Sequence, residues 1–542
     1  MTQTTVSAIV SGACVIAAVP AWMRWLRVAQ REHYLPDATS RFALRWWLSS
    51  PVNITLILVG CAGVALSSRF ALAALASAAV AVAGPAGLSI RGRTSPLAWT
   101  RRLKTLATVS AVAGMAIIYL GIAVGHPPLA GAAIDIGACV MVDLACYLTY
   151  PLEKKLAERY VKSARERLEK VKPRVVAITG SYGKTSTKLY TAHLSAGCYM
   201  TMPSPASFNN RAGLARAINE HLLDSTEVFV AEMGTYGPGE IRELCSWLVP
   251  DISVITAIGP VHLERFKSED RILQAKLEIT ESASTIVLQV DDPRLAALAR
   301  QLEVKGKRVI RCSSHAATDG AIHVEALKNE VTGTIQVNID SGEVAAGVVT
   351  DAQPSNIGLA VGAALALGCP KDIIAERLHT LTSPSHRLER IVSEGHPTVL
   401  DDTYNSNPAG CMAALARLRY DHATGRKVLV TPGMVELGPI QHKENTAFAR
   451  AAADVADLII VVGRTNRKAL LKGIAAAADL EEQPGVTGST GQGGIAESGR
   501  QESRVPKVIT AGNRDKAVGW IRNNLNEQDI VLYENDLPDH YP

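Results

Sequence analysis

The stretch Arg174-Val-Val-Ala-Ile-Thr-Gly-Ser-Tyr-Gly-Lys-Thr185 decides the fold of the larger part of this chain. Its β-branched apolar run, which ends at Thr179, predicts a short buried strand, and the residues after Lys184 are compatible with a helix. A strand, a glycine loop and a helix in this order are the context of a phosphate-binding loop. Gly180 and Gly183 let the backbone approach phosphate oxygens, and Lys184 brings a cation to the β- and γ-phosphates. The expected fold class is therefore α/β, with a parallel-sheet ATPase domain.

This loop defines a candidate nucleotide and metal site. The widely used pattern has four residues between its glycines and this loop has two, so the loop alone also fits a chance glycine turn before a helix. ATP is the expected nucleotide, and the Thr185 hydroxyl is placed to bind Mg²⁺. The residues predicted to bind the nucleotide in this loop are Gly180, Ser181, Gly183, Lys184, Thr185 and Ser186.

Two side chains further along the chain can complete the metal site. Glu232 follows the apolar run Val228-Phe-Val-Ala231, so it lies at the carboxyl end of a strand, where open α/β sheets bind their ligands. His262 follows the strand-like Ser253-Val-Ile-Thr-Ala-Ile258 and can reach the same ion. Taken singly, Glu232 also fits an ordinary exposed glutamate, and His262 also fits a capping histidine.

The phosphate loop and six later motifs resemble those of the Mur ligases, the peptidoglycan amide ligases, and they follow in the family's order. The C-terminal motifs are closest to the branch that adds D-alanyl-D-alanine. The resemblance covers about residues 174–480. The motifs are Thr179-Gly-Ser-Tyr-Gly-Lys-Thr185, Ser207-Phe-Asn-Asn210, Ala231-Glu-Met-Gly234, Ile258-Gly-Pro-Val-His-Leu-Glu264, Ala275-Lys-Leu-Glu278, Asp401-Asp-Thr-Tyr-Asn-Ser-Asn-Pro408 and Met434-Val-Glu-Leu-Gly438.

The resemblance implies a role for each matched position. Lys276 would be carbamylated by CO₂, which converts a cation into an anion that supports a second metal ion, and Lys184, His262 and Lys276 would be catalytic. Asn209 and Asn210 lie in the family's substrate loop. The remaining nucleotide-facing positions are Asn356, Arg387, Asp402, Asn405 and Asn407. Read without the family, Lys276 is an ordinary helix lysine, and the Asx residues are common turn formers.

The first 150 residues have a different composition. Five segments are apolar and long enough, or nearly so, to span a bilayer: residues 5–23, 51–68, 70–90, 105–124 and 129–150. The second and third are separated by a very short turn, so they also fit a partly re-entrant hairpin. A helix follows from Glu153 to Lys172 whose glutamates and basic residues are interleaved, and it fits a solvated linker or a helix lying on anionic headgroups.

Charge predicts the orientation of these segments. The loop after the first segment contains Arg24, Arg27, Arg31, Arg41 and Arg45, and the loop after the third contains Arg91, Arg93, Arg101, Arg102 and Lys104. Basic loops remain in the cytoplasm, so the N-terminus is expected outside and everything after Pro151 inside, where ATP is. The expected location is a bacterial inner (plasma) membrane crossed several times.

The expected organisation has four parts. Residues 1–151 form the membrane region, 152–173 the charged linker helix, 174–383 the ATP-binding domain, and 384–542 a Rossmann-like α/β domain with a disordered insertion at about 481–506. The nine cysteines show no zinc-ligand or disulfide spacing, and the net charge of +5 comes largely from the two basic loops, so no nucleic-acid partner is expected.

The predicted function is an ATP- and Mg²⁺-dependent, ADP-forming ligase that joins a carboxylate to an amine through an acyl phosphate. The expected partners are these two substrates, for which lipid-linked and polymeric forms stay open, and the lipid bilayer. The family's soluble N-terminal domain, which grips a UDP-sugar, has no visible counterpart here. The substrate therefore stays open between a cell-wall precursor, a lipid-linked precursor or envelope polymer, and a polyglutamate-type product. The alternative outside enzymology is a membrane scaffold that binds nucleotide without ligating.

Overall fold

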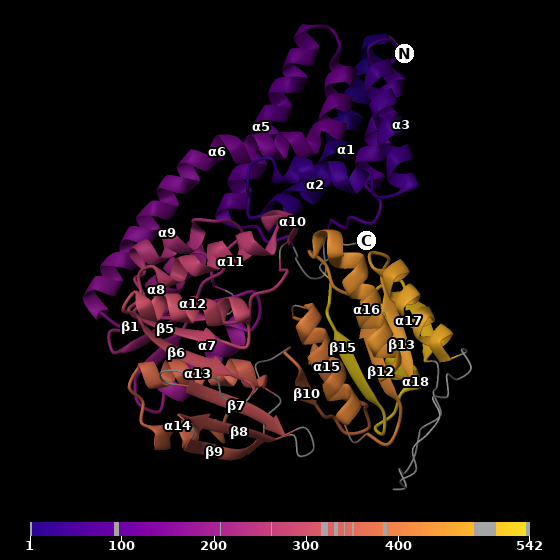
Figure 1. Ribbon diagram of the computed structural model, residues 1–542. Coiled ribbons are helices and arrows are strands. Elements are labelled where there is room, and N and C mark those ends of the chain that lie inside the picture. The colour runs from indigo at the N-terminus through magenta and orange to yellow at the C-terminus, as the bar shows by residue number, and fades with distance from the viewer. Residues whose placement is uncertain are drawn as a thin grey trace. The chain divides into compact units, whose positions relative to one another are not determined.

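The chain forms two compact units, of which Met1–Ala157 belongs to one and Glu158–Asp536 to the other. A computed structural model describes residues 3–90, 97–205, 208–261, 263–315, 323–329, 334–340, 342–349, 352–382, 387–404, 406–421, 423–481 and 506–537. Figure 1 shows the helical first unit and the two sheets of the second.

The first unit is entirely helical in its described part. It contains α1 (Gln3–Arg31), α2 (Ala38–Trp47), α3 (Pro51–Ser67), η1 (Ala71–Ala73), α4 (Ala74–Ala83), α5 (Arg101–Ala123) and the first part of α6 (Pro127–Val171). Among the described residues, α1, α5 and α6 are long and apolar enough to cross a membrane, and α2 with α3, bent by 112°, adds a fourth if the pair is one span. The expected segment 70–90 is represented by the shorter helices η1 and α4, so the five-span topology stays a prediction.

Two charged residues hold this unit together through backbone groups. The Arg24 guanidinium of α1 donates to the carbonyl oxygens of Ala81, Gly84 and Leu88 at the end of α4 and after it. The Asp143 carboxylate of α6 accepts from the amides of Thr39 (3.2 Å) and Ser40 (2.6 Å) in the first turn of α2. Because buried charges need such partners, these contacts fix how the helices pack.

The expected fifth span and the expected charged linker lie in one continuous helix. α6 runs for 45 residues and contains Pro151. Its last turns belong to the second unit, where Val161 and Ala164 are buried and Arg167 donates to the carbonyl oxygen of Leu222 (2.7 Å). The two segments read as separate in the sequence because the composition turns abruptly charged from Glu153 onward.

The first sheet of the second unit has nine strands in the order β2-β3-β1-β4-β5-β6-β7-β8-β9. Neighbours from β2 to β7 pair in parallel, whereas β7, β8 and β9 pair antiparallel. The strands are β1 (Arg174–Thr179), β2 (Thr201–Pro203), β3 (Val228–Glu232), β4 (Ile252–Ile255), β5 (Thr285–Gln289), β6 (Arg308–Ser313), β7 (His323–Asn329), β8 (Thr334–Ile339) and β9 (Gly342–Val349).

Helices cover both faces of this sheet, so its central parallel strands β1, β3 and β4 are almost entirely buried. One core lies under α7 (Lys184–Ser195), α13 (Pro354–Ala366) and α14 (Lys371–Leu378). The other lies under the end of α6, α8 (Arg211–His221), α9 (Glu240–Trp247) and α12 (Pro293–Val304), and α10 (Leu263–Phe266), α11 (Glu269–Leu277) and η2 (Glu278–Thr280) follow β4. Alternate residues of β1 enter the two cores, Val176 and Ile178 one of them, Val175 and Ala177 the other.

The second sheet has six strands in the order β10-β11-β15-β12-β13-β14, and only β10 is antiparallel to its neighbour. The helices of this part are α15, α16, α17 and α18. The strands predicted at 428–430, 458–462 and 508–510 are confirmed as β12, β13 and β14. The bounds are β10 (Glu389–Ile391), β11 (Thr398–Asp402), α15 (Pro408–Tyr420), β12 (Lys427–Thr431), η3 (Gly438–Ile440), α16 (Gln441–Ala453), β13 (Leu458–Val462), α17 (Arg467–Glu481), β14 (Lys507–Ala511), α18 (Arg514–Asn524) and β15 (Ile530–Glu534). The expected insertion at 481–506 lies outside the described residues except at its two ends.

The strand order places a ligand site at the carboxyl ends of β1 and β4. After β1 the chain continues to β2 and β3 on one side, and after β4 it continues to β5 on the other. Open α/β sheets bind ligands in the crevice at such a switch point. The glycine loop follows β1, and the segment leading to His262 follows β4.

Candidate active site

The glycine loop joins β1 to α7 in the conformation that a phosphate loop requires. Gly183 has a φ of 78° and stands at the N-cap of α7, where no side chain caps the helix. The first amides of α7 are therefore available to an anion. Gly180 has a φ of 152° and lies against Thr256, which leaves no room for a side chain. Both predicted glycines are thus required by the backbone.

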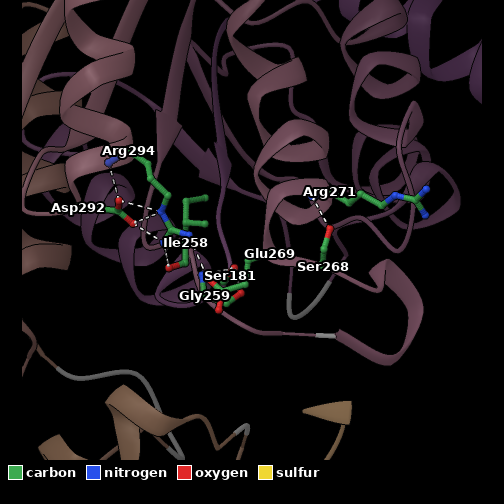
Figure 2. Close-up of polar contacts among 8 residues, drawn as sticks. All are labelled: Ser181, Ile258, Gly259, Ser268, Glu269, Arg271, Asp292 and Arg294. Carbon is green, nitrogen blue, oxygen red and sulfur yellow. Dashed lines mark hydrogen bonds and ion pairs between the residues drawn. The ribbon is translucent and has the colours of Figure 1, made fainter. Parts of the chain in front are cut away.

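A second loop, after β4, is fastened to the phosphate loop. Figure 2 shows Ser181 beside Gly259: the Ser181 hydroxyl donates to the Gly259 carbonyl (2.9 Å) and accepts from the Gly259 amide (3.0 Å). The Ser181 amide also donates to the carbonyl of Ala257 (2.7 Å). These contacts fix the segment that leads to His262, which itself lies outside the described residues.

Arg294, at the start of α12, forms further bonds to the loop after β4. Figure 2 shows its guanidinium bonded to the Ile258 carbonyl (3.1 Å), the Asp292 carboxylate (2.7 Å) and the Glu269 carboxylate (3.0 Å). Glu269 begins α11, and the Ser268 hydroxyl caps this helix by accepting from the Arg271 amide (3.3 Å). Arg294 therefore connects the loop after β4 to the helix that contains Lys276.

Glu232, at the end of β3, lies directly opposite the phosphate loop. Its Oε2 accepts from the Thr185 hydroxyl (2.8 Å), and its Oε1 accepts from the Asn209 amide (3.0 Å). Burial raises the pKa of this carboxyl, but Lys184, Lys188 and the two hydrogen bonds outweigh it and leave the pKa below its ordinary value. Glu232 is therefore a carboxylate at neutral pH, as a metal ligand must be.

Two predicted lysines, Lys184 and Lys276, belong to this region. The Lys184 ammonium donates to the carbonyls of Gly180 (2.9 Å) and Ser181 (3.3 Å), and burial is the main cause that lowers its pKa. Lys276 of α11 is only 5% exposed. Burial, and then the charge of Lys184, lower the pKa of Lys276 well below its ordinary value. This shift favours the neutral amine, which is the form that reacts with CO₂.

The predicted nucleotide residues of the second half reach the same loop. Asn356, in the first turn of α13, accepts from the Thr187 hydroxyl (3.3 Å) and fills the space beside Gly183. Arg387 donates to the Thr185 hydroxyl (3.2 Å) and lies over the Tyr404 ring at 4.4 Å.

Asp402 ends β11 and accepts from the Leu388 amide (3.2 Å), next to Arg387. Burial raises the pKa of Asp402 to about 6, although Arg387 opposes the rise. Ser186 lies in the first turn of α7. The neighbouring predicted position Asn405 lies outside the described residues.

The two predicted substrate asparagines differ in their contacts. Asn209 bonds Glu232, whereas the side chain of Asn210 caps α8 by accepting from the Gly213 amide (2.9 Å). Asn407 likewise caps α15 by accepting from the Gly410 amide (2.9 Å).

The described residues fit a hard divalent cation. Thr185 and Glu232 offer a hydroxyl and a carboxylate oxygen within 2.8 Å of each other, which are ligands that Mg²⁺ prefers. No three His, Cys, Asp or Glu side chains gather into a metal site in the part of the chain that the structure describes. Of the four expected ligands, Thr185 and Lys276 are not of these residue types and His262 lies outside the described residues, so Glu232 alone could belong to such a group.

Three residues that the sequence reading did not single out belong to this region. Lys188 pairs with Glu232 at 3.5 Å, Arg294 supports the loop after β4, and Glu534 of β15 lies opposite Asp402. Lys188 follows Lys184 by one helical turn, and this spacing was the feature of the sequence that could have identified it. Nothing in the local sequence distinguishes Arg294 or Glu534 from surface charges.

The fold and this site define an ATP-dependent ligase built on a phosphate loop, and comparisons with known proteins name its family. Residues 178–364 match the "Mur ligase middle domain" and residues 386–533 the "Mur ligase, glutamate ligase domain". The chain belongs to the Mur ligase family, whose members are ATP-dependent, ADP-forming amide-bond ligases of cell-wall synthesis. The resemblance expected from the motifs is thus confirmed, and the first 177 residues lie outside both matches.

Individual relatives agree with this assignment. The UDP-N-acetylmuramoyl-tripeptide–D-alanyl-D-alanine ligase of Mycobacterium tuberculosis (strain CDC 1551 / Oshkosh) is 30% identical over 372 residues, which are 66% of this chain and 69% of that protein. The ligase of the same name from Bacillus subtilis is 26% identical over 357 residues, 65% of this chain and 72% of that protein.

Solved structures show the same fold. MurF from Acinetobacter baumannii superposes with a TM-score of 0.56 at 22% identity, covering 70% of this chain and 77% of that chain. MurF from Thermotoga maritima, in complex with ADP, has a TM-score of 0.54 at 22% identity, covering 70% of this chain and 80% of that chain.

Proposed function

We propose that this protein is a membrane-anchored ligase that couples ATP cleavage to amide-bond formation on a cell-wall or envelope precursor. The observation that supports this most directly is the 2.8 Å contact between Thr185 of the phosphate loop and Glu232 at the end of β3, with Lys184 in the same loop. A carboxylate that faces the hydroxyl of a phosphate loop is the arrangement that holds Mg²⁺ on a bound nucleotide.

The proposed reaction has two steps. A substrate carboxylate oxygen attacks the γ-phosphorus of ATP, and the bond to the β-phosphate oxygen breaks, so that ADP and an acyl phosphate form. An amine nitrogen then attacks the acyl carbon, phosphate leaves with the electron pair of the C–O bond, and the nitrogen loses a proton. The protein contributes position and charge, because phosphoryl transfer needs little covalent chemistry from the enzyme.

The described side chains have roles in this proposal. Lys184 would leave the loop carbonyls to which it donates and neutralise phosphate oxygens, and the uncapped amides of α7 would add further donors. Arg387, 3.2 Å from the Thr185 hydroxyl, would add a third source of positive charge. Thr185, Glu232 and His262 would hold Mg²⁺, which offsets the negative charge that builds up on the transferred phosphate.

We propose further that Lys276 acts as a carbamate. Its burial and the Lys184 cation favour the neutral amine, the form that reacts with CO₂. The resulting anion would be favoured by Lys184 and would supply oxygen ligands to a second Mg²⁺.

The substrates and the location are proposed on separate grounds. The names of the relatives suggest UDP-N-acetylmuramoyl-tripeptide as the carboxylate and D-alanyl-D-alanine as the amine. The apolar helices α1, α5 and α6 support an anchor in the plasma membrane with the N-terminus outside and the catalytic unit in the cytoplasm. Such an anchor equally favours a lipid-linked precursor or an envelope polymer as substrate.

A screen for ADP release tests this proposal. Full-length protein in detergent is given ATP, Mg²⁺ and pairs of carboxylate and amine, beginning with the pair named above and continuing with lipid-linked peptides and glutamate. We expect ADP and a new amide, identified by mass, only when both substrates are present, and neither from Lys184→Met. If the wild type hydrolyses no ATP with any pair, the ligase assignment is wrong.

A further inference from the structure

Lys188 is an ammonium group enclosed in the site itself. Its side chain is 1% exposed, and its Nζ lies 3.5 Å from Oε2 of Glu232, whose side chain is 3% exposed. It follows Lys184 by one turn of α7, so both lysines project from the same face of the helix. Their contacts differ, because Lys184 donates to loop carbonyls and Lys188 faces the carboxylate.

The stability of the fold does not explain this lysine. Burying an ammonium and a carboxylate removes both from water, and a well-packed apolar pair of the same size is often as stable or more so. Burial lowers the pKa of Lys188, the Glu232 carboxylate opposes this change, and the Arg387 cation adds to it. A charged side chain in such a position is easier to understand from what it does to Glu232.

The contacts of Glu232 show what that effect is. The oxygen that faces Lys188 is the one that accepts from Thr185, whereas the other oxygen accepts from Asn209. A divalent cation that joined Thr185 to Glu232 would therefore bind beside the Lys188 ammonium. Like charges repel strongly in a site screened from water, so the ammonium opposes such a cation.

From this geometry we infer that Lys188 is a resident counter-cation for Glu232, which prevents a divalent cation from binding stably until the nucleotide adds its negative charge. The metal then enters together with ATP rather than before it. Lys188 acts through Glu232 and is a positioning residue. This inference rests on the metal site of the proposed function.

The test measures metal binding without nucleotide and without catalysis. Mn²⁺ replaces Mg²⁺, and free Mn²⁺ is followed by electron paramagnetic resonance over full-length wild type, Lys188→Met and Lys188→Arg. We expect Lys188→Met to bind Mn²⁺ at least about tenfold more tightly than the wild type, because the repelling charge is gone. Lys188→Arg, which keeps the charge, should stay within about twofold of the wild type. Lys162→Met on the exposed surface of α6 is the matched control and should change nothing.

Adding a non-hydrolysable ATP analogue separates the possible failures. Wild type with the analogue should bind Mn²⁺ through Glu232, so Glu232→Gln should lose that binding. If Glu232→Gln binds as the wild type does, the metal site of the proposed function is wrong. If that site is real but nucleotide-free Lys188→Met binds Mn²⁺ no more tightly than the wild type, the counter-cation role alone is refuted. Lys188→Gln serves the same comparison if the methionine variant does not fold.

Discussion

Replacing Gly183 by alanine tests whether the phosphate loop is built as described. The residue has a φ of 78°, and an added Cβ would lie 3.0 Å from Cγ and 3.3 Å from Nδ2 of Asn356, with Oδ1 nearer still. A left-handed backbone costs an alanine about 1–2 kcal/mol. Asn356 must also move and lose its bond from Thr187, a further loss of about 0.5–1.5 kcal/mol. We expect α7 to be destabilised by about 1.5–3.5 kcal/mol in all.

Gly239→Ala is the matched control for this experiment. Gly239 also precedes a helix, α9, with a φ of 90°, but a Cβ there would meet nothing within 4 Å. The Gly239→Ala variant should lose only the free energy of placing an alanine in a left-handed backbone conformation, about 1–2 kcal/mol. Hydrogen exchange of the α7 and α9 amides in full-length protein reports both local opening free energies. ADP release should disappear in Gly183→Ala and persist in Gly239→Ala.

A third variant isolates the contribution of Asn356. In the double variant Gly183→Ala with Asn356→Ala, the Asn356 side chain that would meet the new Cβ is absent. Compared with Asn356→Ala alone, the double variant should therefore lose only as much α7 stability as α9 loses in Gly239→Ala. If Gly183→Ala leaves the opening of α7 unchanged, or if the second substitution relieves nothing, the tight contact between the phosphate loop and α13 is not present in solution.

Three further results are expected. Lys276→Ala and Lys276→Arg should both lose the ligase rate, and short carboxylic acids should restore part of it to the alanine variant only; a largely active arginine variant would exclude the carbamate. Burial raises the pKa of Asp402 from 3.8 to about 6. Ionisation of this carboxyl therefore lowers the free energy of unfolding. The loss is absent below about pH 4, grows as the pH rises, and is complete above about pH 6. Asp402→Asn should therefore raise the melting temperature at pH 8 and lose this advantage as the pH falls to 4, and a constant gain would contradict the buried carboxyl. Single cysteines at Arg41 and Arg101 should resist labelling from outside intact cells, whereas one at His126, between α5 and α6, should react; the reverse pattern would invert the topology.

The phosphate loop and the end of β3 could be predicted because each depends on local sequence. A β-branched run followed by Gly180 and Gly183 permits few backbone paths, and Glu232 directly follows its strand. The parallel pairing of β1 with β3 then brings their carboxyl ends together, and the Thr185–Glu232 contact at 2.8 Å follows from it.

Asn209 and Asn210 show why the rest of the site could not be predicted. The residues are identical neighbours in one motif, and the start of α8 alone separates them. Asn210 becomes the N-cap, so its oxygen is occupied by the Gly213 amide, and Asn209 is left to reach Glu232.

Glu534 illustrates a second limit, because its position depends on a partner far away in the sequence. β11 and β15 pair in parallel and place Asp402 opposite Glu534. Burial, and then the charge of Asp402, raise the pKa of Glu534 well above its ordinary value. Neither residue shows this in its local sequence, since the pairing is a property of the assembled sheet.

Two further lysines of this region, Lys188 and Lys276, are buried, and their surroundings favour opposite charges. Lys188 lies 3.5 Å from the Glu232 carboxylate, so a carbamate there would put two anions together. Lys276 is influenced by the Lys184 cation, which disfavours an ammonium and favours an anion. CO₂ should therefore modify Lys276 and leave Lys188 unmodified. In ¹³C-bicarbonate, full-length protein should show one slowly exchanging carbamate resonance that disappears in Lys276→Ala and persists in Lys188→Met. Loss of the resonance in the Lys188 variant alone would mean that this assignment of charges is reversed.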